Sequence, residues 1–138
     1  MPPFKCNHDG TCTEIRLCCT DTEMTLTKKD AKRIDALGYN REDYLIRMDD
    51  GFCQIRNIEG RCYFYNPDQL TCRIYSHRPE GCKYYPIVYN VEKGKCVVDY
   101  DCPSGKTVTE EDIEEICDKV KFLVTVLMKE ADCRDGPC

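Results

Sequence analysis

The feature that most constrains this chain is its cysteine content, because thirteen of its 138 residues are cysteine. Two of them, Cys18 and Cys19, are adjacent in the stretch RLCCTDTE. A disulfide normally joins residues whose Cα atoms lie about 5.5–6 Å apart, whereas adjacent Cα atoms lie about 3.8 Å apart. The two neighbours are therefore poorly placed to bond to each other, and we expect each thiol to have another use.

Two explanations compete for so many thiols, namely a disulfide framework and metal ligation. Disulfides are typical of secreted proteins, but the cysteine count is odd and the N-terminal MPPFKCNHDG has no apolar core of the kind a signal peptide needs. We therefore favour metal ligation in a cytoplasmic protein. Disulfides stay open as the alternative, because the composition is also compatible with a hyperthermophile, whose cytosolic proteins can contain them.

Composition and charge narrow the classes of partner. Hydrophobic residues make up 41% of the chain and charged residues 33%, as in a folded globular protein. The net charge of −5 provides no positive field for phosphates, so we expect no nucleic-acid partner. No apolar run approaches the roughly 20 residues of a membrane span, so we expect no membrane insertion. The length fits one domain over residues 1–138.

Two short helices are expected in the N-terminal half. Thr27 and Asp30 form a capping-box-like start for the first, and Gly38 ends it. Asn40 is a candidate cap for the second, which we predict over Arg41–Met48. A loop carrying four cysteines, over residues 4–19, precedes both helices.

Short strands and one long helix are expected in the rest of the chain. Residues 52–102 have aromatic and β-branched segments cut by turn residues, including a hairpin with arms Ile87–Asn90 and Cys96–Tyr100. An apolar stripe then runs from about residue 109 to 131, and Cys117 lies on it, which favours core packing for that thiol. The sequence predicts a small single-domain α+β fold with a loop-rich cysteine core, short strands or a hairpin, two short helices and a long C-terminal helix.

Thiolates are ligands for zinc, copper(I) and iron–sulfur clusters. Cys62, Cys72 and Cys82 are spaced ten residues apart, and Cys96 and Cys102 flank a predicted strand. No CxxC occurs, so the spacings of zinc ribbons, thioredoxin-type sites and ferredoxins are absent, as are HExxH, GxGxxG and P-loop motifs. The spacing therefore indicates a thiolate-rich site without naming the metal.

Basic residues lie between two of these cysteines. Four thiolates on a divalent metal carry a net charge of about −2, and a buried charge needs partners. Arg73, His77 and Arg78 follow Cys72 and precede Cys82. We predict that these side chains contact the ligating sulfur atoms, and the alternative is that they form solvated surface.

The stretch GRCYFYNPDQLTCRIYSHRPEGCKYYP contains the pattern Cys-x-Ile-Tyr-x-x-Arg-Pro-x-x-Cys. With this pattern the chain resembles the CxxCxxCC family, also called the YkgJ-like group, to which zinc or iron chelation is assigned. Family members have an N-terminal cysteine cluster ending in an adjacent pair, then a helix, this motif and a late cysteine before proline, here Cys102. The resemblance covers about residues 4–103. It departs from the family where CxxC usually precedes the adjacent pair, because five residues here separate Cys12 from Cys18.

The resemblance and the chemistry of thiolates together assign the candidate site. The predicted metal ligands are Cys6, Cys12, Cys18, Cys19, Cys62, Cys72, Cys82 and Cys102. The roles of five other cysteines stay open: Cys53, Cys96, Cys117, Cys133 and Cys138. For the last two, a tail metal site, a disulfide and an unbonded thiol are all alternatives.

We expect a metal-binding protein rather than an enzyme, working in metal handling or electron transfer. The resemblance favours an iron–sulfur cluster, of the 4Fe-4S type, over zinc, and the metal or cluster is the expected partner, with a protein partner also open. Some relatives are linked to lysine methylation of flagellin, so a methyltransferase-like enzyme or enzyme subunit is one alternative. The other is an interaction module stapled by metal or disulfides.

Overall fold

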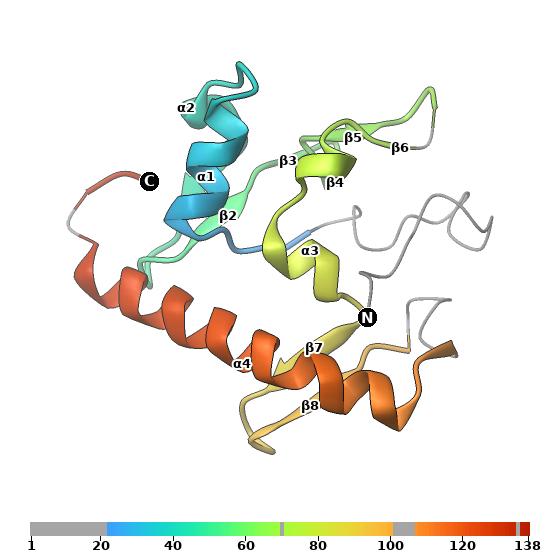
Figure 1. The fold of residues 1–138 in the computed structure, drawn as a ribbon. Helices are drawn as coiled ribbons and strands as arrows, with labels where there is room; N and C mark the ends of the chain where they lie inside the picture. Colours follow the sequence, from blue (N-terminus) through green and yellow to red (C-terminus); the bar gives the residue numbers. More distant parts are fainter. Residues whose placement is uncertain (1–21, 70, 101–106, 135) are drawn as a thin grey trace.

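The computed structural model describes residues 22–69, 71–100, 107–134 and 136–138. Within these residues the helices are α1 (Lys28–Asp35), α2 (Arg41–Tyr44), α3 (Glu80–Tyr84) and α4 (Glu110–Cys133), with a 3-10 turn, η2 (Tyr75–His77). The strands are β1 (Leu45–Arg47), β2 (Cys53–Ile55), β3 (Asn57–Ile58), β4 (Arg61–Cys62), β5 (Tyr65–Asn66), β6 (Thr71–Cys72), β7 (Ile87–Asn90) and β8 (Lys95–Val98). The strands pair two by two as antiparallel ribbons, β1–β2, β3–β4, β5–β6 and β7–β8 (Figure 1). The protein is a small α+β domain, as the sequence predicts.

The helix predicted over Arg41–Met48 is wrong beyond its first turn. Asn40 does cap α2, since its side chain accepts from the Glu42 amide at 3.3 Å, but the helix ends at Tyr44. The next three residues form β1, which pairs with β2 across the turn at residues 48–52. The ribbon buries Leu45 against Ile55, and a continued helix would lose this cross-strand contact.

The capping box predicted for the first helix is confirmed, and the last helix has one as well. At α1 the Thr27 hydroxyl accepts from the Asp30 amide, and the Asp30 carboxylate accepts in return from the Thr27 amide. Thr109 and Asp112 repeat this exchange at α4. Each box satisfies amide groups that a helix start leaves without an intrahelical partner.

The larger of two hydrophobic cores lies under α1 and the first ribbons. Its fully buried side chains include Ile34 and Tyr44 from the two short helices and Phe64 from the β4–β5 connection. The Phe64 ring packs against the rings of Tyr39 and Tyr44, with centroids 5.0 and 5.3 Å away. Aromatic packing of this kind replaces the tryptophan that the chain lacks.

Tyr44 also anchors α1 from within this core. Its hydroxyl donates to the Ala31 carbonyl at 3.0 Å and to the Asp35 carboxylate at 2.7 Å. Burial, together with Asp35, raises the pKa of Tyr44 above its usual range. The hydrogen bond from Arg41 lowers the pKa of Asp35, so the carboxylate stays charged near neutral pH.

The smaller core joins the β7–β8 hairpin to the N-terminal half of α4. It contains Ile87 and Cys96 from the hairpin and Ile116 and Val120 from the helix. Figure 1 shows α4 running from this hairpin past α3 towards the β1–β2 ribbon. The chain then turns back towards α1 and α2, where Cys138 packs against the larger core.

Two disulfides bind α4 and its tail to the strands. Cys96 of β8 is bonded to Cys117 of α4, and their Cα atoms lie 5.8 Å apart. Cys53 of β2 is bonded to Cys138, with 6.0 Å between Cα atoms and a sequence separation of 85 residues. The helix is thus cross-linked on both sides of the fold.

The turn between β1 and β2 touches the end of α4. Gly51 has a φ of +90°, and a Cβ atom added there would lie 2.6 Å from the backbone oxygen of Ala131. Arg134, which follows α4, also donates to the Gly51 carbonyl. The turn therefore needs glycine both for its backbone conformation and for this close approach.

A matched pair of glycines tests that contact. Gly38 also has a positive φ, +101°, but nothing lies within 4 Å of its added Cβ. We expect Gly51→Ala to lower the free energy of unfolding by about 1–3 kcal/mol more than Gly38→Ala, because only the first adds a steric overlap to the backbone strain. Guanidinium denaturation of both variants measures the difference. Equal losses would show that the turn does not pack on α4.

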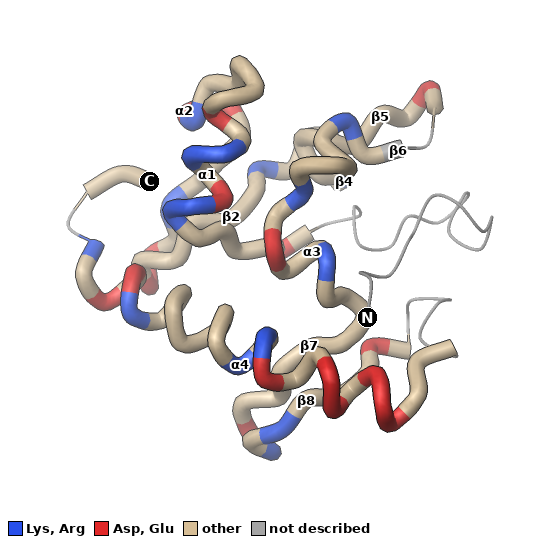
Figure 2. The backbone as a smooth tube through the Cα atoms, in the orientation of Figure 1, with Lys and Arg blue, Asp and Glu red and all other residues tan. Residues whose placement is uncertain are grey.

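Charged side chains are unevenly placed along α4. Its first turn contains Glu110, Glu111 and Asp112, visible as the red segments at the start of the helix in Figure 2. Acidic side chains at this end interact favourably with the positive end of the helix dipole.

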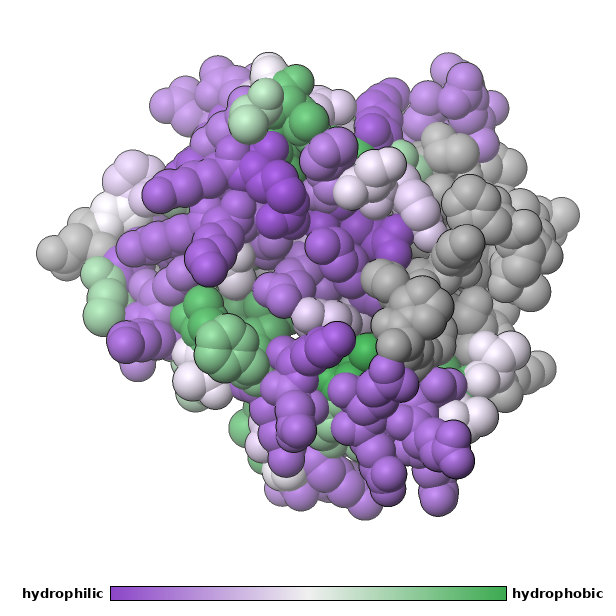
Figure 3. Space-filling model, in the orientation of Figure 1, coloured by the Kyte–Doolittle hydropathy of each residue, from purple (hydrophilic) through white to green (hydrophobic). Residues whose placement is uncertain are grey.

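In Figure 3 the visible face of the molecule is largely hydrophilic. A small hydrophobic area lies over the middle of α4, and this helix exposes Phe122 and Met128. Scattered exposed apolar side chains of this kind are ordinary on a protein surface.

Candidate metal centre

Three of the predicted ligands lie on three different elements in the middle of the chain. Cys62 ends β4, Cys72 ends β6 and Cys82 lies within α3. Cys62 is buried, whereas Cys72 and Cys82 are half-buried. Cys72 is the register partner of Tyr65 in the β5–β6 ribbon and packs against the larger core.

The position of Cys82 depends on a hydrogen-bond network around Asp30. This carboxylate is 1% exposed and accepts from the Arg33 guanidinium at 2.8 Å and from the Glu80 amide at 3.2 Å. The second contact joins the first turn of α3 to α1, 50 residues earlier in the chain. Buried carboxylates need such partners, and here they fix the short helix that contains Cys82.

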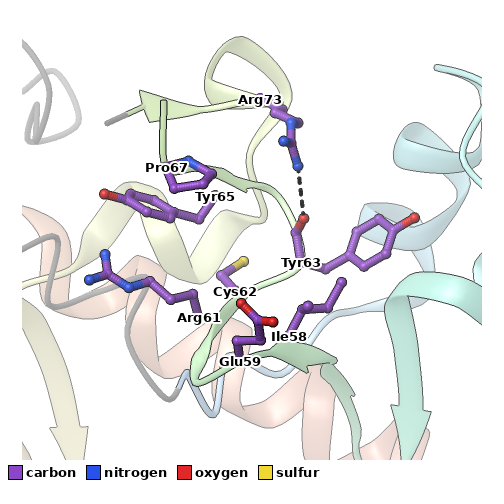
Figure 4. Close-up of a pocket in the computed structure, with 8 residues that line it drawn as sticks. All are labelled: Ile58, Glu59, Arg61, Cys62, Tyr63, Tyr65, Pro67 and Arg73. Carbon is purple, nitrogen blue, oxygen red and sulfur yellow. Dashed lines mark hydrogen bonds between the residues drawn. The ribbon is translucent and has the colours of Figure 1, made fainter. Parts of the chain in front are cut away.

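Cys62 lies in the wall of a pocket of about 370 Å³ (Figure 4). Tyr65 and Pro67 line it on one side, and Arg61 and Arg73 add two guanidinium groups. The Arg61 guanidinium carbon lies 4.9 Å from the centre of the Tyr65 ring. Two guanidinium groups thus share the pocket wall with a predicted thiolate ligand.

The three basic residues predicted to contact bound sulfur differ in position. Arg73 is exposed, lines the Cys62 pocket and donates to the Tyr63 carbonyl at 3.4 Å. Arg78 is buried, with its guanidinium carbon 4.1 Å from the centre of the Tyr75 ring. His77 is exposed in η2. Arg73 is thus beside a predicted ligand, whereas contacts of the other two with a metal-bound sulfur stay predictions.

Tyr84 lies on α3 two residues after Cys82. Its hydroxyl donates to the Glu80 carboxylate at 2.7 Å. Burial raises the pKa of Tyr84 above its usual range, and the hydrogen bond to Glu80 adds to the effect. The side chain therefore stays neutral and adds no charge beside the candidate site.

The described residues do not complete a metal site by themselves. Among them, no three His, Cys, Asp or Glu side chains converge closely enough to hold an ion, so Cys62, Cys72 and Cys82 do not form a three-ligand group. The other predicted ligands, Cys6, Cys12, Cys18, Cys19 and Cys102, lie outside the described residues. Ligation by any of the eight stays a prediction.

The two disulfides between described residues use cysteines whose roles the sequence left open. The packing of Cys117 against the smaller core is confirmed, but its bond to Cys96 was not predicted. A disulfide was one of the alternatives for Cys138, and its partner is Cys53. The preference for metal over disulfides therefore does not hold for these four residues, because packing brings each pair within bonding distance.

Comparison with known proteins decides the family. The profile of CxxCxxCC, described as "Putative zinc- or iron-chelating domain", matches residues 6–117. The chain belongs to the CxxCxxCC family. The match includes all eight predicted ligands and extends beyond the 4–103 range of the expected resemblance, up to Cys117 in α4.

A curated relative in this comparison is "Uncharacterized protein MJ0661" of Methanocaldococcus jannaschii. It is 29% identical over 97 residues, which are 65% of this chain and 51% of that protein. The chain thus spans about half the length of the curated relative it matches. No solved structure gives a significant match. In the described part of the chain no helix is both long and apolar enough to cross a bilayer.

Proposed function

We propose that this protein is a CxxCxxCC-family metal binder whose thiolates hold an iron–sulfur cluster of the 4Fe-4S type, with zinc as the alternative. It would act in metal handling or electron transfer rather than catalysis. The donor set would come from the eight predicted cysteines, of which a four-iron cluster needs four. The family's description as zinc- or iron-chelating supports metal binding in general, and the cluster is the finer part of the proposal.

The division of the cysteines is the observation that most supports this proposal. The two disulfides take Cys53, Cys96, Cys117 and Cys138, and none of these is a predicted ligand. Within the part of the chain that the structure describes, the cysteines of these two disulfides and the predicted ligands are therefore separate sets.

The chemistry around Cys62 also fits a thiolate site. Arg61 and Arg73 line the pocket beside it, and their charge would offset part of the negative charge of bound thiolates. Burial of Cys62 under aromatic side chains would limit the access of water, which is one of the factors that set a cluster's potential. We also propose a cytoplasmic location, and the two disulfides fit a cytosol of the hyperthermophile kind.

Metal and sulfide analysis of the full chain, purified without oxygen, tests the proposal. A 4Fe-4S cluster predicts about four iron atoms and four acid-labile sulfides per chain, with broad absorption of visible light. Stoichiometric zinc in a colourless protein would show that the bound metal is zinc and that no iron–sulfur cluster is present. A folded protein that contains neither metal would overturn the function itself.

A further inference from the structure

A second pocket lies beside α2, the β1–β2 ribbon and the tail, and it shares no lining residue with the Cys62 pocket. It has a volume of about 570 Å³, within the usual range for small-molecule sites. Three arginines line it: Arg41 at the start of α2, Arg47 at the end of β1 and Arg56 just after β2. Nothing in the candidate metal centre requires this clustering of guanidinium groups.

The charges of these arginines are only partly offset. Arg41 is paired with Asp35, and Glu42 also lines the pocket. Arg47 and Arg56 are exposed, and no described carboxylate lies within ion-pair distance of either. Arg56 makes one weak contact, from its guanidinium to the Leu45 carbonyl at 3.4 Å. Arg47 and Arg56 therefore bring positive charge to the pocket that no described side chain offsets as an ion pair.

The tail of the chain forms one wall of the pocket. Pro137 and Cys138 line it, and the bond from Cys138 to Cys53 holds them against β2. The Arg41 guanidinium also donates to the backbone oxygen of Cys138 at 2.8 Å. The disulfide, this hydrogen bond and the packing of Cys138 on the larger core together hold the tail at the pocket.

We propose that this pocket binds a small molecule carrying a doubly charged tetrahedral oxyanion, such as a phosphate group, and that the Cys53–Cys138 disulfide completes the site. Guanidinium groups match such anions because they donate several hydrogen bonds in a fixed plane. Arg47 and Arg56 would hold the anion, and the rest of the pocket would take the remainder of the molecule. The proposal is independent of the metal that the protein binds.

Titration of the full chain with sodium sulfate, followed by amide NMR signals, tests this site. Sulfate is a tetrahedral dianion that does not compete strongly for thiolate-bound metals. Sodium chloride at matched ionic strength corrects for screening. We expect saturable shifts for Glu42, Leu45 and Arg56, with affinity lowered about fivefold or more in Arg47→Gln and Arg56→Gln.

Two further variants separate the anion site from general charge effects. Lys119→Gln removes one exposed positive charge from α4, outside the pocket, and should bind sulfate as the wild type does. Cys138→Ser should bind more weakly by about threefold or more, because the wall is released. Shifts that chloride reproduces, or unchanged affinity in both arginine variants, would overturn the anion site. Unchanged affinity in Cys138→Ser would overturn the role of the disulfide.

Discussion

Replacing Cys72 by serine or by alanine is expected to remove about nine-tenths or more of the bound metal. A site that loses one thiolate from its donor set binds metal far more weakly, since even the loss of an outer contact costs about 10–100-fold in affinity. Cys72 also packs against the larger core, so the serine variant adds the cost of a half-buried hydroxyl. The alanine variant avoids that cost. The metal content per folded chain is measured for each of the two variants.

Cys133→Ser is the matched control for this change. Cys133 is exposed at the end of α4 and is not a predicted ligand. Its replacement should leave the metal content unchanged. If the Cys72→Ala variant kept its full metal content, Cys72 would be a packed core thiol. It would then not belong to the set of metal ligands.

Loss of the Cys53–Cys138 disulfide is expected to lower the free energy of unfolding by about 2–4 kcal/mol. A cross-link stabilises mainly by restricting the unfolded chain, and the effect grows with the length of the closed loop. The bond spans 85 residues, whereas Cys96–Cys117 spans 21. Breaking the longer loop should therefore cost about 1 kcal/mol more than breaking the shorter one.

Cys138→Ser and Cys117→Ser make this comparison with the least disturbance. Each replaces the half-buried member of its pair and leaves the buried partner, Cys53 or Cys96, in the core. Guanidinium denaturation at equal metal loading gives the two free energies. A larger loss in Cys117→Ser would contradict the loop-length argument, and no loss in either would mean that the cross-links do not form in solution.

Local sequence signals, such as helix caps and hairpin patterns, were sufficient to predict where several helices and strands begin. The capping boxes begin α1 at Lys28 and α4 at Glu110, and β7 has the bounds Ile87–Asn90 predicted for the first hairpin arm. The helix predicted through Met48 failed because its last residues pair with a strand beyond the turn. That pairing is a tertiary contact, and single-residue propensities do not contain it.

The candidate site was predictable in its chemistry but not in its cross-links. The cysteine spacing and the Cys-x-Ile-Tyr pattern led to the family that the profile match confirms. The pairing of Cys53 with Cys138 depends on where α4 ends relative to β2, 85 residues away in sequence. The arginine pocket was missed for the same reason, since Arg41, Arg47 and Arg56 meet only when the β1–β2 ribbon forms.

Alkylation of the native protein, mapped by mass spectrometry before and after metal removal, tests the central claim most directly. We expect at least four of the eight proposed ligands, with Cys72 and Cys82 among them, to resist iodoacetamide with metal bound and to react once a chelator removes it. Cys133 should react in both states, and the four disulfide cysteines in neither. Half-buried Cys72 and Cys82 are the most informative, because their burial alone does not protect them. If these two react at the same rate with and without metal, the cysteines of the family motif are not the metal ligands.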